Sequence, residues 1–129
     1  MAKDPSQPIV VLMTASSGDE ANGIAEMLIS KRLAGCVQIL PEMQSIYFWK
    51  GEMQRDREVL ILAKTMASRF TELEGEVRAL HSYETPEIVA LPIIAGSTPY
   101  LEWLAENLQS EQQRSTNANS REAKRWHRP

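Results

Sequence analysis

The sequence predicts an α+β domain with the order strand, helix, strand, strand, helix, strand, followed by a short helix. Three observations indicate this. Apolar runs typical of strands alternate with segments of helical periodicity. Two β-rich arms meet at the turn Lys50-Gly51. The chain has 129 residues, 43% of them hydrophobic and 24% charged, which suits one globular domain.

The first strand and helix occupy the N-terminal third of the domain. Ile9–Met13 is a continuous apolar run, typical of a strand buried on both faces. Ser17 and Glu20 then form a capping-box pattern. Apolar residues recur behind this pattern at helical spacing, and Gly35 is expected to end the helix.

A long hairpin is predicted in the middle of the chain. Its arms are Cys36–Trp49, with a bend at Pro41, and Glu52–Met66. Each arm of about 14 residues would span about 45 Å at ~3.3 Å per residue. A domain of this size has a radius of gyration of only about 13 Å. The hairpin must therefore bend sharply or project beyond its own subunit.

A helix, an edge strand and a final helix complete the pattern. The helix covers about residues 68–80, and the strand covers Ile88–Ile94, where Pro92 indicates an edge or a bulge. Thr98 is predicted as the N-cap of the last helix, with Pro99 in its first turn. This order is the ferredoxin-like βαββαβ arrangement, an antiparallel sheet with two helices on one face.

Composition divides the chain into three parts. Residues 1–8 are predicted to be flexible, residues 9–108 form the ferredoxin-like domain, and residues 109–129 form a tail that is disordered or vector-derived. The net charge is −3, but five basic and two acidic residues in the tail leave −6 in the rest.

An acidic body lacks the electrostatic footprint of a nucleic-acid-binding protein. No apolar run approaches the ~20 residues that a membrane span needs. The first residues lack the apolar stretch of a signal peptide, and Cys36 is the only cysteine. These features predict a cytoplasmic protein without membrane or nucleic-acid partners.

Aromatic residues gather at the hairpin tip. Ile46 precedes Tyr47, Phe48 and Trp49, and an exposed cluster of this kind usually marks an interface. The rings either fold back over their own sheet or are covered by identical chains. The length of the hairpin favours a closed homo-oligomer.

Motifs of nucleophilic or cofactor-dependent enzymes are absent from the sequence. It contains no G-x-S-x-G elbow, no phosphate-binding loop and no dinucleotide fingerprint. We therefore expect no enzymatic activity and no obligatory cofactor. The candidate ligands for Cu(II) or another divalent cation are Cys36 and His81. The alternative for Cys36 is a buried structural thiol.

Charged residues also occur next to apolar segments. Lys64 ends an apolar run and must reach water or a carboxylate. Glu84 and Glu87 lie in a polar loop. Together these residues form either a ligand pocket or a set of contacts that pins the loop. The aromatic walls of the pocket would be Trp49, Tyr83 and Trp103.

Four segments resemble the hallmark segments of the CutA divalent-cation-tolerance family. They are residues 45–51, 58–65, 83–92 and 100–104, and the similarity runs without gaps from about residue 9 to 108. The resemblance implies a cytoplasmic homotrimer of ferredoxin-like subunits, similar in architecture to the PII signal-transduction proteins. It also implies a role in tolerance of copper and other divalent cations. The residues that match the family's recurrent interface residues are Cys36, Trp49, Lys64, Tyr83, Glu84, Pro86, Glu87 and Trp103.

Two functions are compatible with this resemblance. The first is copper tolerance or response, with the metal bound at or near the subunit interface by Cys36, His81 and carboxylates. Met13 and Glu76 occupy positions where some members of the family have further cysteines, so Cys36 is the only thiol of this chain that could bind the metal. The alternative is a PII-like trimer that binds a small anionic metabolite between subunits, near Lys64.

Overall fold

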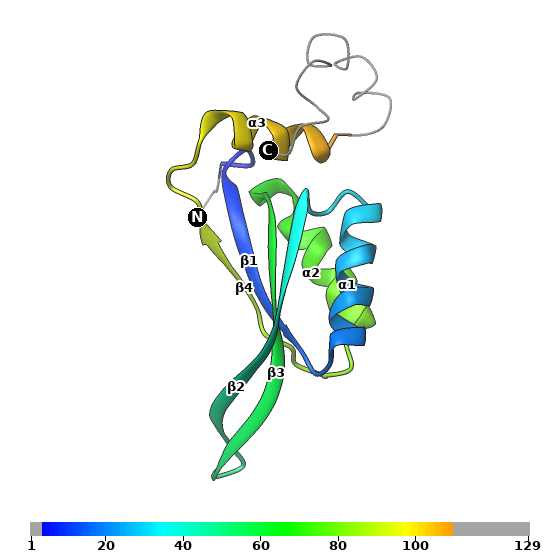
Figure 1. The fold of residues 1–129 in the computed structure, drawn as a ribbon, viewed down its shortest axis with the longest axis vertical. Helices are drawn as coiled ribbons and strands as arrows, with labels where there is room; N and C mark the ends of the chain where they lie inside the picture. Colours follow the sequence, from blue (N-terminus) through cyan, green and yellow to red (C-terminus); the bar gives the residue numbers. More distant parts are fainter. Residues whose placement is uncertain (1–3, 110–129) are drawn as a thin grey trace.

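The computed structural model describes residues 4–109, and its elements follow the predicted order (Figure 1). The strands form one antiparallel sheet in the order β2-β3-β1-β4. This order and the two crossover helices confirm the predicted α+β architecture. The elements are β1 (Pro8–Ala15), α1 (Gly18–Ser30), β2 (Cys36–Trp49), β3 (Glu52–Met66), a 3₁₀ turn (Ala67–Arg69), α2 (Phe70–Leu80), β4 (Ile88–Pro92) and α3 (Thr98–Asn107).

One face of the sheet carries the hydrophobic core. Helices α1 and α2 lie side by side over this face (Figure 1). Val11 and Met13 of β1 and Ile61 of β3 point into it and are fully buried. Side chains alternate between the two faces of a strand, so every second residue of β1 and β3 faces away from the helices.

The other face, here called the open face, has no helix over its centre within residues 4–109, and α3 contacts it only at the Lys64 end. The prediction that the first strand is buried on both faces is therefore wrong for the single chain. Val10 and Leu12 are only half-buried, because no helix packs over them. Leu40, Val89 and Leu91, on the neighbouring strands, are 47–52% exposed.

Helix α1 begins with a variant of the predicted capping box. The Ser17 hydroxyl accepts a hydrogen bond from the Glu20 N–H at 3.1 Å, as expected. The Glu20 carboxylate, however, accepts from the N–H and the hydroxyl of Ser16, one residue before the N-cap, at 2.9 Å each. The side chain thereby secures the end of β1 as well as the helix.

Gly35 does not end α1, contrary to the prediction. The helix stops at Ser30, and Arg32 takes the left-handed conformation with a φ of 59°. Gly35 instead lets α3 approach closely. A Cβ atom there would lie 2.7 Å from Leu104 Cδ1 and 3.1 Å from the Leu104 carbonyl oxygen.

The hairpin projects beyond the rest of the domain, and its tip is exposed (Figure 1). Lys50 and Gly51 both have positive φ angles, 53° and 81°, which fits the predicted two-residue turn. The register of β2 shifts between Leu40 and Met43, which confirms the irregularity predicted at Pro41. Four apolar side chains at the tip are 42–72% exposed: Ile46, Tyr47, Phe48 and Trp49.

The two ends of the domain differ slightly from the prediction. The carbonyl oxygens of Pro5 and Gln7 accept hydrogen bonds from Ser68 and Ala67 at 3.0 and 2.8 Å. The predicted flexible segment therefore joins the domain from about residue 4. Apart from Gln109, the predicted tail 109–129 lies outside the described residues.

The C-terminal elements are also shorter or shifted. Strand β4 ends at Pro92 and pairs only with β1, so it is the predicted edge strand. Ile94 lies beyond it and is 93% exposed. The N-cap of α3 is Ser97, not Thr98, because the Ser97 hydroxyl accepts the Tyr100 N–H at 3.3 Å.

Candidate functional site

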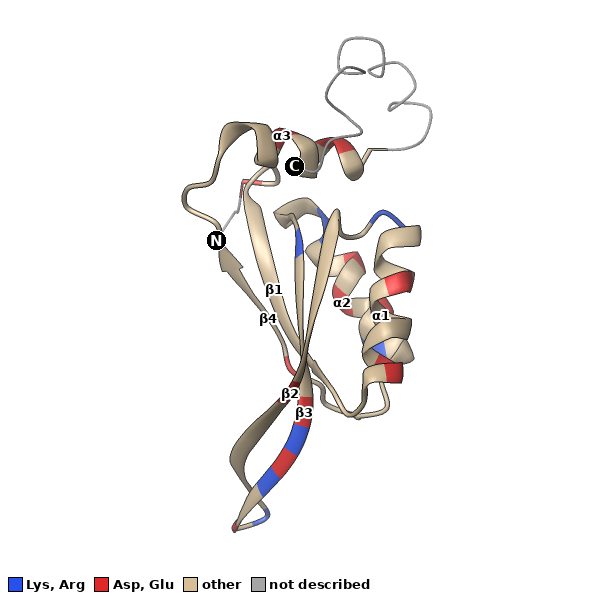
Figure 2. Ribbon diagram, in the orientation of Figure 1, with Lys and Arg blue, Asp and Glu red and all other residues tan. Residues whose placement is uncertain are grey.

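A groove of about 510 Å³ lies where the open face meets the base of the hairpin. Carboxylates and aromatic rings line it, and no lysine or arginine is among the lining residues. Figure 2 shows acidic and basic residues along the β3 arm beside this region, while the sheet above is mostly uncharged. We call it the carboxylate groove; its lining residues are Thr14, Tyr47, Trp49, Asp56, Glu58, Tyr83, Glu84, Thr85 and Glu87.

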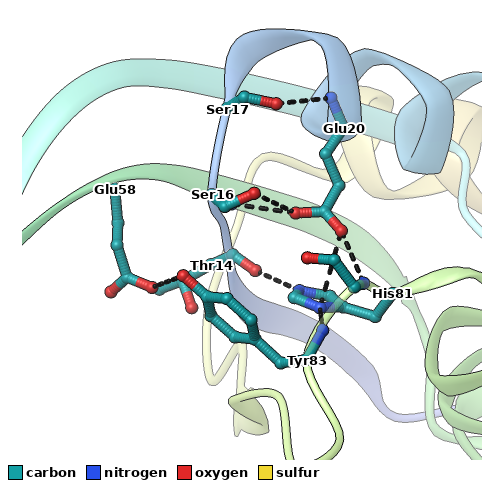
Figure 3. Close-up of polar contacts among 8 residues, drawn as sticks. Thr14, Ser16, Ser17, Glu20, Glu58, His81 and Tyr83 are labelled. Carbon is teal, nitrogen blue, oxygen red and sulfur yellow. Dashed lines mark hydrogen bonds and ion pairs between the residues drawn. The ribbon is translucent and has the colours of Figure 1, made fainter.

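Glu58 is the most buried carboxylate of the groove, with 9% of its surface exposed. Its Oε2 accepts a hydrogen bond from the Tyr83 hydroxyl at 3.1 Å (Figure 3). Burial, this hydrogen bond and the nearby charges of Glu58, Asp56 and Glu20 raise the pKa of Tyr83 to about 12. The phenol therefore stays protonated near neutral pH and remains a donor to Glu58.

His81 fixes the loop that carries Tyr83. Its Nε2 lies 2.7 Å from the carbonyl oxygen of Thr14, and its Nδ1 accepts the Tyr83 N–H at 3.0 Å (Figure 3). A carbonyl oxygen can only accept, so Nε2 carries the proton and Nδ1 does not. Both ring nitrogens are thus committed to the backbone, and the one lone pair of the neutral ring, on Nδ1, is not available for a metal ion in this conformation.

Glu20 holds the same loop from the helix side. Its Oε2 accepts the Ser82 N–H at 2.7 Å and lies 3.7 Å from His81 Nδ1. Burial by itself raises the pKa of Glu20, but the hydrogen bonds from Ser16 and Ser82 outweigh burial and lower it to about 2. The carboxylate is therefore ionised across the physiological range and anchors the loop 81–87 to the start of α1.

The predicted ligand pocket is divided between two places. Trp49, Tyr83, Glu84 and Glu87 line the carboxylate groove, as predicted for one cleft. Lys64 is absent from it, because Lys64 lies six positions beyond Glu58 on β3. At ~3.3 Å per residue this separation is about 20 Å, far beyond the reach of a lysine side chain.

Lys64 and Trp103 lie together at the opposite end of the sheet. The Lys64 ammonium is 5.4 Å from the centre of the Tyr100 ring, a cation–π distance. The ring centres of Tyr100 and Trp103 are 5.7 Å apart. Within residues 4–109, no carboxylate lies within ion-pair distance of Lys64. We call this second cluster the lysine end.

The predicted metal ligands Cys36 and His81 do not share a site within one chain. Cys36 is opposite Lys64 in the sheet, and Lys64 is opposite Val10. The ring of His81 bonds to Thr14, which lies four residues, or about 13 Å, further along β1. Among the described residues, no three His, Cys, Asp or Glu side chains form a group that could hold a metal ion.

The sequence interpretation missed two acidic members of the groove, Asp56 and Glu58. Both have even numbers on β3, as Leu60, Leu62 and Lys64 do, so all five share one face. This period of two was visible in the sequence. It also places an acidic pair and a lysine at opposite ends of one apolar stripe.

Comparison with known proteins identifies the family. The family described as CutA1 divalent ion tolerance protein matches residues 9–107. The divalent-cation tolerance protein CutA of Thermus thermophilus is 51% identical over 98 residues, which are 76% of this chain and 95% of that protein. Human Protein CutA is 39% identical over 106 residues, which are 82% of this chain but only 59% of the human protein.

A solved structure supports the same assignment. The structure named periplasmic divalent cation tolerance protein CutA from Archaeoglobus fulgidus superposes with a TM-score of 0.77 at 37% identity, and covers 79% of this chain and 99% of its own. The fold, the matched family and these relatives agree over the whole described domain. The chain therefore belongs to the CutA1 divalent ion tolerance protein family.

Proposed function

We propose that the protein is a homotrimer that binds divalent cations, copper among them, at or near its subunit interfaces and acts in tolerance of or response to them. The observation that carries this proposal is the carboxylate groove. Asp56, Glu58, Glu84 and Glu87 line one open cavity without a lysine or arginine among the lining residues. Such a groove attracts cations and repels anions.

The homotrimer has separate support from the open face. Half-exposed Leu40, Val89 and Leu91 lie on it, and the tip residues Phe48 and Trp49 are 72% and 60% exposed. Apolar surface of this extent on a single chain usually belongs to an interface. The description of the family and the names of the Thermus thermophilus and Archaeoglobus fulgidus relatives refer to divalent ions or cations.

Copper binding needs a softer ligand than the groove supplies. Carboxylate oxygens suit Mg²⁺ and Mn²⁺, whereas copper prefers nitrogen and sulfur ligands. Cys36 is a free, half-buried thiol on the open face, so it is the better supported of the two predicted ligands. Within one chain Cys36 lies opposite Lys64, far from the groove carboxylates, so a site that uses both requires two chains of the proposed trimer.

The test is calorimetric titration with Cu(II) and, separately, with Mn(II). His127 is replaced by alanine throughout, because any histidine imidazole can bind copper and would obscure the result. We expect Cys36→Ser to weaken Cu(II) binding at least tenfold. We expect the double variant Glu84→Gln with Glu87→Gln to weaken the binding of both Cu(II) and Mn(II). Glu26→Gln, an exposed carboxylate on α1, is the matched control. Cu(II) and Mn(II) isotherms that do not change in these variants would contradict metal binding at these residues.

The PII-like alternative, an anionic metabolite in the same cleft, has less support. The groove is acidic, and Lys64 of the same chain, the cation expected to hold the anion, lies about 20 Å away along β3. No helix within residues 4–109 is long and apolar enough to cross a membrane. We retain a cytoplasmic location as part of the proposal, although relatives include proteins named periplasmic and chloroplastic.

A further inference from the structure

The carboxylate groove is wider than a metal ion requires. Its volume is about 510 Å³, and pockets of roughly 300–1,000 Å³ typically hold small organic molecules. A hard metal ion instead needs several oxygen ligands that converge on one point. Within residues 4–109, no three His, Cys, Asp or Glu side chains form such a group. In a single chain, the groove therefore suits a cation whose charge is spread over a longer molecule.

Three aromatic rings line the same groove as the carboxylates. Tyr47 and Trp49 come from the end of β2, and Tyr83 comes from the loop after α2. The face of such a ring attracts an ammonium group at up to about 6 Å from its centre, and it also packs against methylene groups. A metal ion would use only the oxygen atoms of the groove, whereas an organic ammonium ion can use both the oxygen atoms and the rings.

The charge of Glu58 is not balanced within the described chain. Glu58 is only 9% exposed, and its Oε2 accepts the Tyr83 hydroxyl at 3.1 Å (Figure 3). Within residues 4–109, Oε1 has no hydrogen bond and neither oxygen has an ion-pair partner. Arg57, next to it in the sequence, points to the opposite face of β3 and pairs with Glu42 at 3.8 Å. A buried carboxylate without a cation is costly, so Glu58 indicates a cationic ligand in the groove.

A second carboxylate lies next to Glu58 on the same face of β3. Asp56 precedes Glu58 by two residues and also lines the groove, so the two backbone positions are about 7 Å apart along the strand. An extended aliphatic diamine of the length of putrescine separates its two ammonium groups by a similar distance. Each ammonium group can therefore reach one carboxylate, while the methylene chain between them lies on the aromatic rings.

We infer that the carboxylate groove binds a short aliphatic diamine, with one ammonium group at Glu58, the other at Asp56, and the methylene chain against the aromatic rings. The first ammonium group supplies the cation that the buried carboxylate lacks. Glu84 and Glu87 are exposed lining residues, and their negative charge attracts such a ligand from solution. The inference goes beyond the proposed binding of metal ions and does not depend on it, because one chain supplies every group that it uses.

The probe is putrescine, titrated calorimetrically into the full, metal-free chain at low salt. We expect saturable binding of one putrescine per chain, with half-saturation below about 1 mM. Butylamine has the same carbon chain but only one ammonium group, so we expect it to bind roughly tenfold more weakly. A wild-type chain that does not bind putrescine, or that binds it no better than butylamine, overturns the inference.

A charge-removing variant tests the place of the ligand. Glu58→Gln removes the charge but keeps an oxygen atom that can accept from Tyr83, and it should weaken putrescine binding roughly tenfold. Glu26→Gln, an exposed carboxylate on α1, is the matched control and should leave the affinity unchanged. Equal affinities of the wild type and of Glu58→Gln for putrescine also overturn the inference.

A second pair of variants tests the rings without changing a buried residue. Trp49 is 60% exposed, so its replacement is not expected to disturb the fold. Trp49→Leu should weaken putrescine binding roughly threefold, whereas Trp49→Tyr keeps an aromatic face and should stay within about twofold of the wild type. Equal affinities of these two variants would overturn the placement of the diamine against the rings.

Titration of the same protein with Mn(II) and Cu(II) separates this inference from the proposed function. Saturable putrescine binding without metal binding supports the inference and rejects the proposed function. Metal binding without putrescine binding rejects the inference and leaves the proposed function standing.

Discussion

The two faces of the sheet have similar apolar sequences but very different surroundings. On the helix side, Val11, Met13 and Ile61 are fully buried by α1 and α2. On the open face, Leu40, Val89 and Leu91 remain about half exposed. A soluble domain rarely leaves such a continuous apolar sheet face in water. The helix side is the core of the chain, and the exposure of the open face is the reason why we propose that an assembly covers it.

Charge distribution sharpens this contrast. The core cluster on the helix side consists of hydrophobic residues. The open face carries carboxylates at one end and Lys64 at the other. Hydrophobic burial is non-directional, whereas charges at the two ends can select one alignment of neighbouring chains. The open face therefore has the features of a specific interface.

The largest expected effect comes from a truncation on the helix side. Ile61→Ala removes a fully buried side chain and should lower the free energy of unfolding by about 2–5 kcal/mol. Urea denaturation measures this loss, which should be the same at low and high protein concentration. Ile61→Val is the control and should cost about 0.5–1.5 kcal/mol. A loss that depends on protein concentration would contradict the separation of the two faces.

The neighbouring residue provides the matched test of the open face. Leu62 lies next to Ile61 but points to the opposite face and is half-buried. Leu62→Ala should cost about 1 kcal/mol in a dissociated chain and more, about 2–3 kcal/mol, where a neighbouring chain covers the site. Urea midpoints across a hundredfold range of protein concentration test this expectation. Equal losses at both extremes would argue against an interface on the open face.

Local sequence patterns were sufficient to predict most of the fold. The capping residue Ser17, the turn at Lys50-Gly51 and the edge strand before Pro92 depend on contacts within a few residues or on the chemistry of one residue. Gly35 was misread because its role depends on Leu104, which is distant in sequence. Glycine after a helix is a common stop signal, and the local pattern contained no sign of α3.

The candidate site was predictable only in part, for a geometric reason. Residues of one loop, such as Tyr83 and Glu84, were correctly assigned to one place. Within one chain Lys64 lies elsewhere, because its position depends on how far β3 extends past the loop, and a cleft between subunits that includes Lys64 stays a prediction. The sequence interpretation treated the His81 imidazole as available to a metal ion. The Thr14 carbonyl oxygen that accepts its hydrogen bond lies on β1, far from His81 in the sequence, so the local pattern gave no sign of this contact.

A smaller, pH-dependent effect tests the anchor on the helix side. The folded pKa of Glu20 is about 2 and its ordinary value is 4.5, so its stabilising contribution is complete above pH 4.5 and disappears as the pH falls to about 2. Glu20→Gln should therefore cost roughly 2 kcal/mol at pH 7, and the difference from the wild type should vanish near pH 2. Glu26→Gln, exposed on the same helix, should give a small, pH-independent difference. A Glu20→Gln deficit that persists at pH 2 would contradict this account.

The smallest effect is expected at the groove, where the same loop meets the open face. Tyr83→Phe removes the hydroxyl that donates to Glu58 at 3.1 Å and should cost about 1 kcal/mol. The pKa of Tyr83 is raised from 10.0 to about 12 by burial and by its acidic neighbours, so this contribution should be complete below pH 10 and lost as the pH rises through 12. Absorbance titration of the phenols should show a group near pH 12 in the wild type that is missing from the variant. A wild-type titration without a group near pH 12, or a Tyr83→Phe titration that still contains it, would contradict this account.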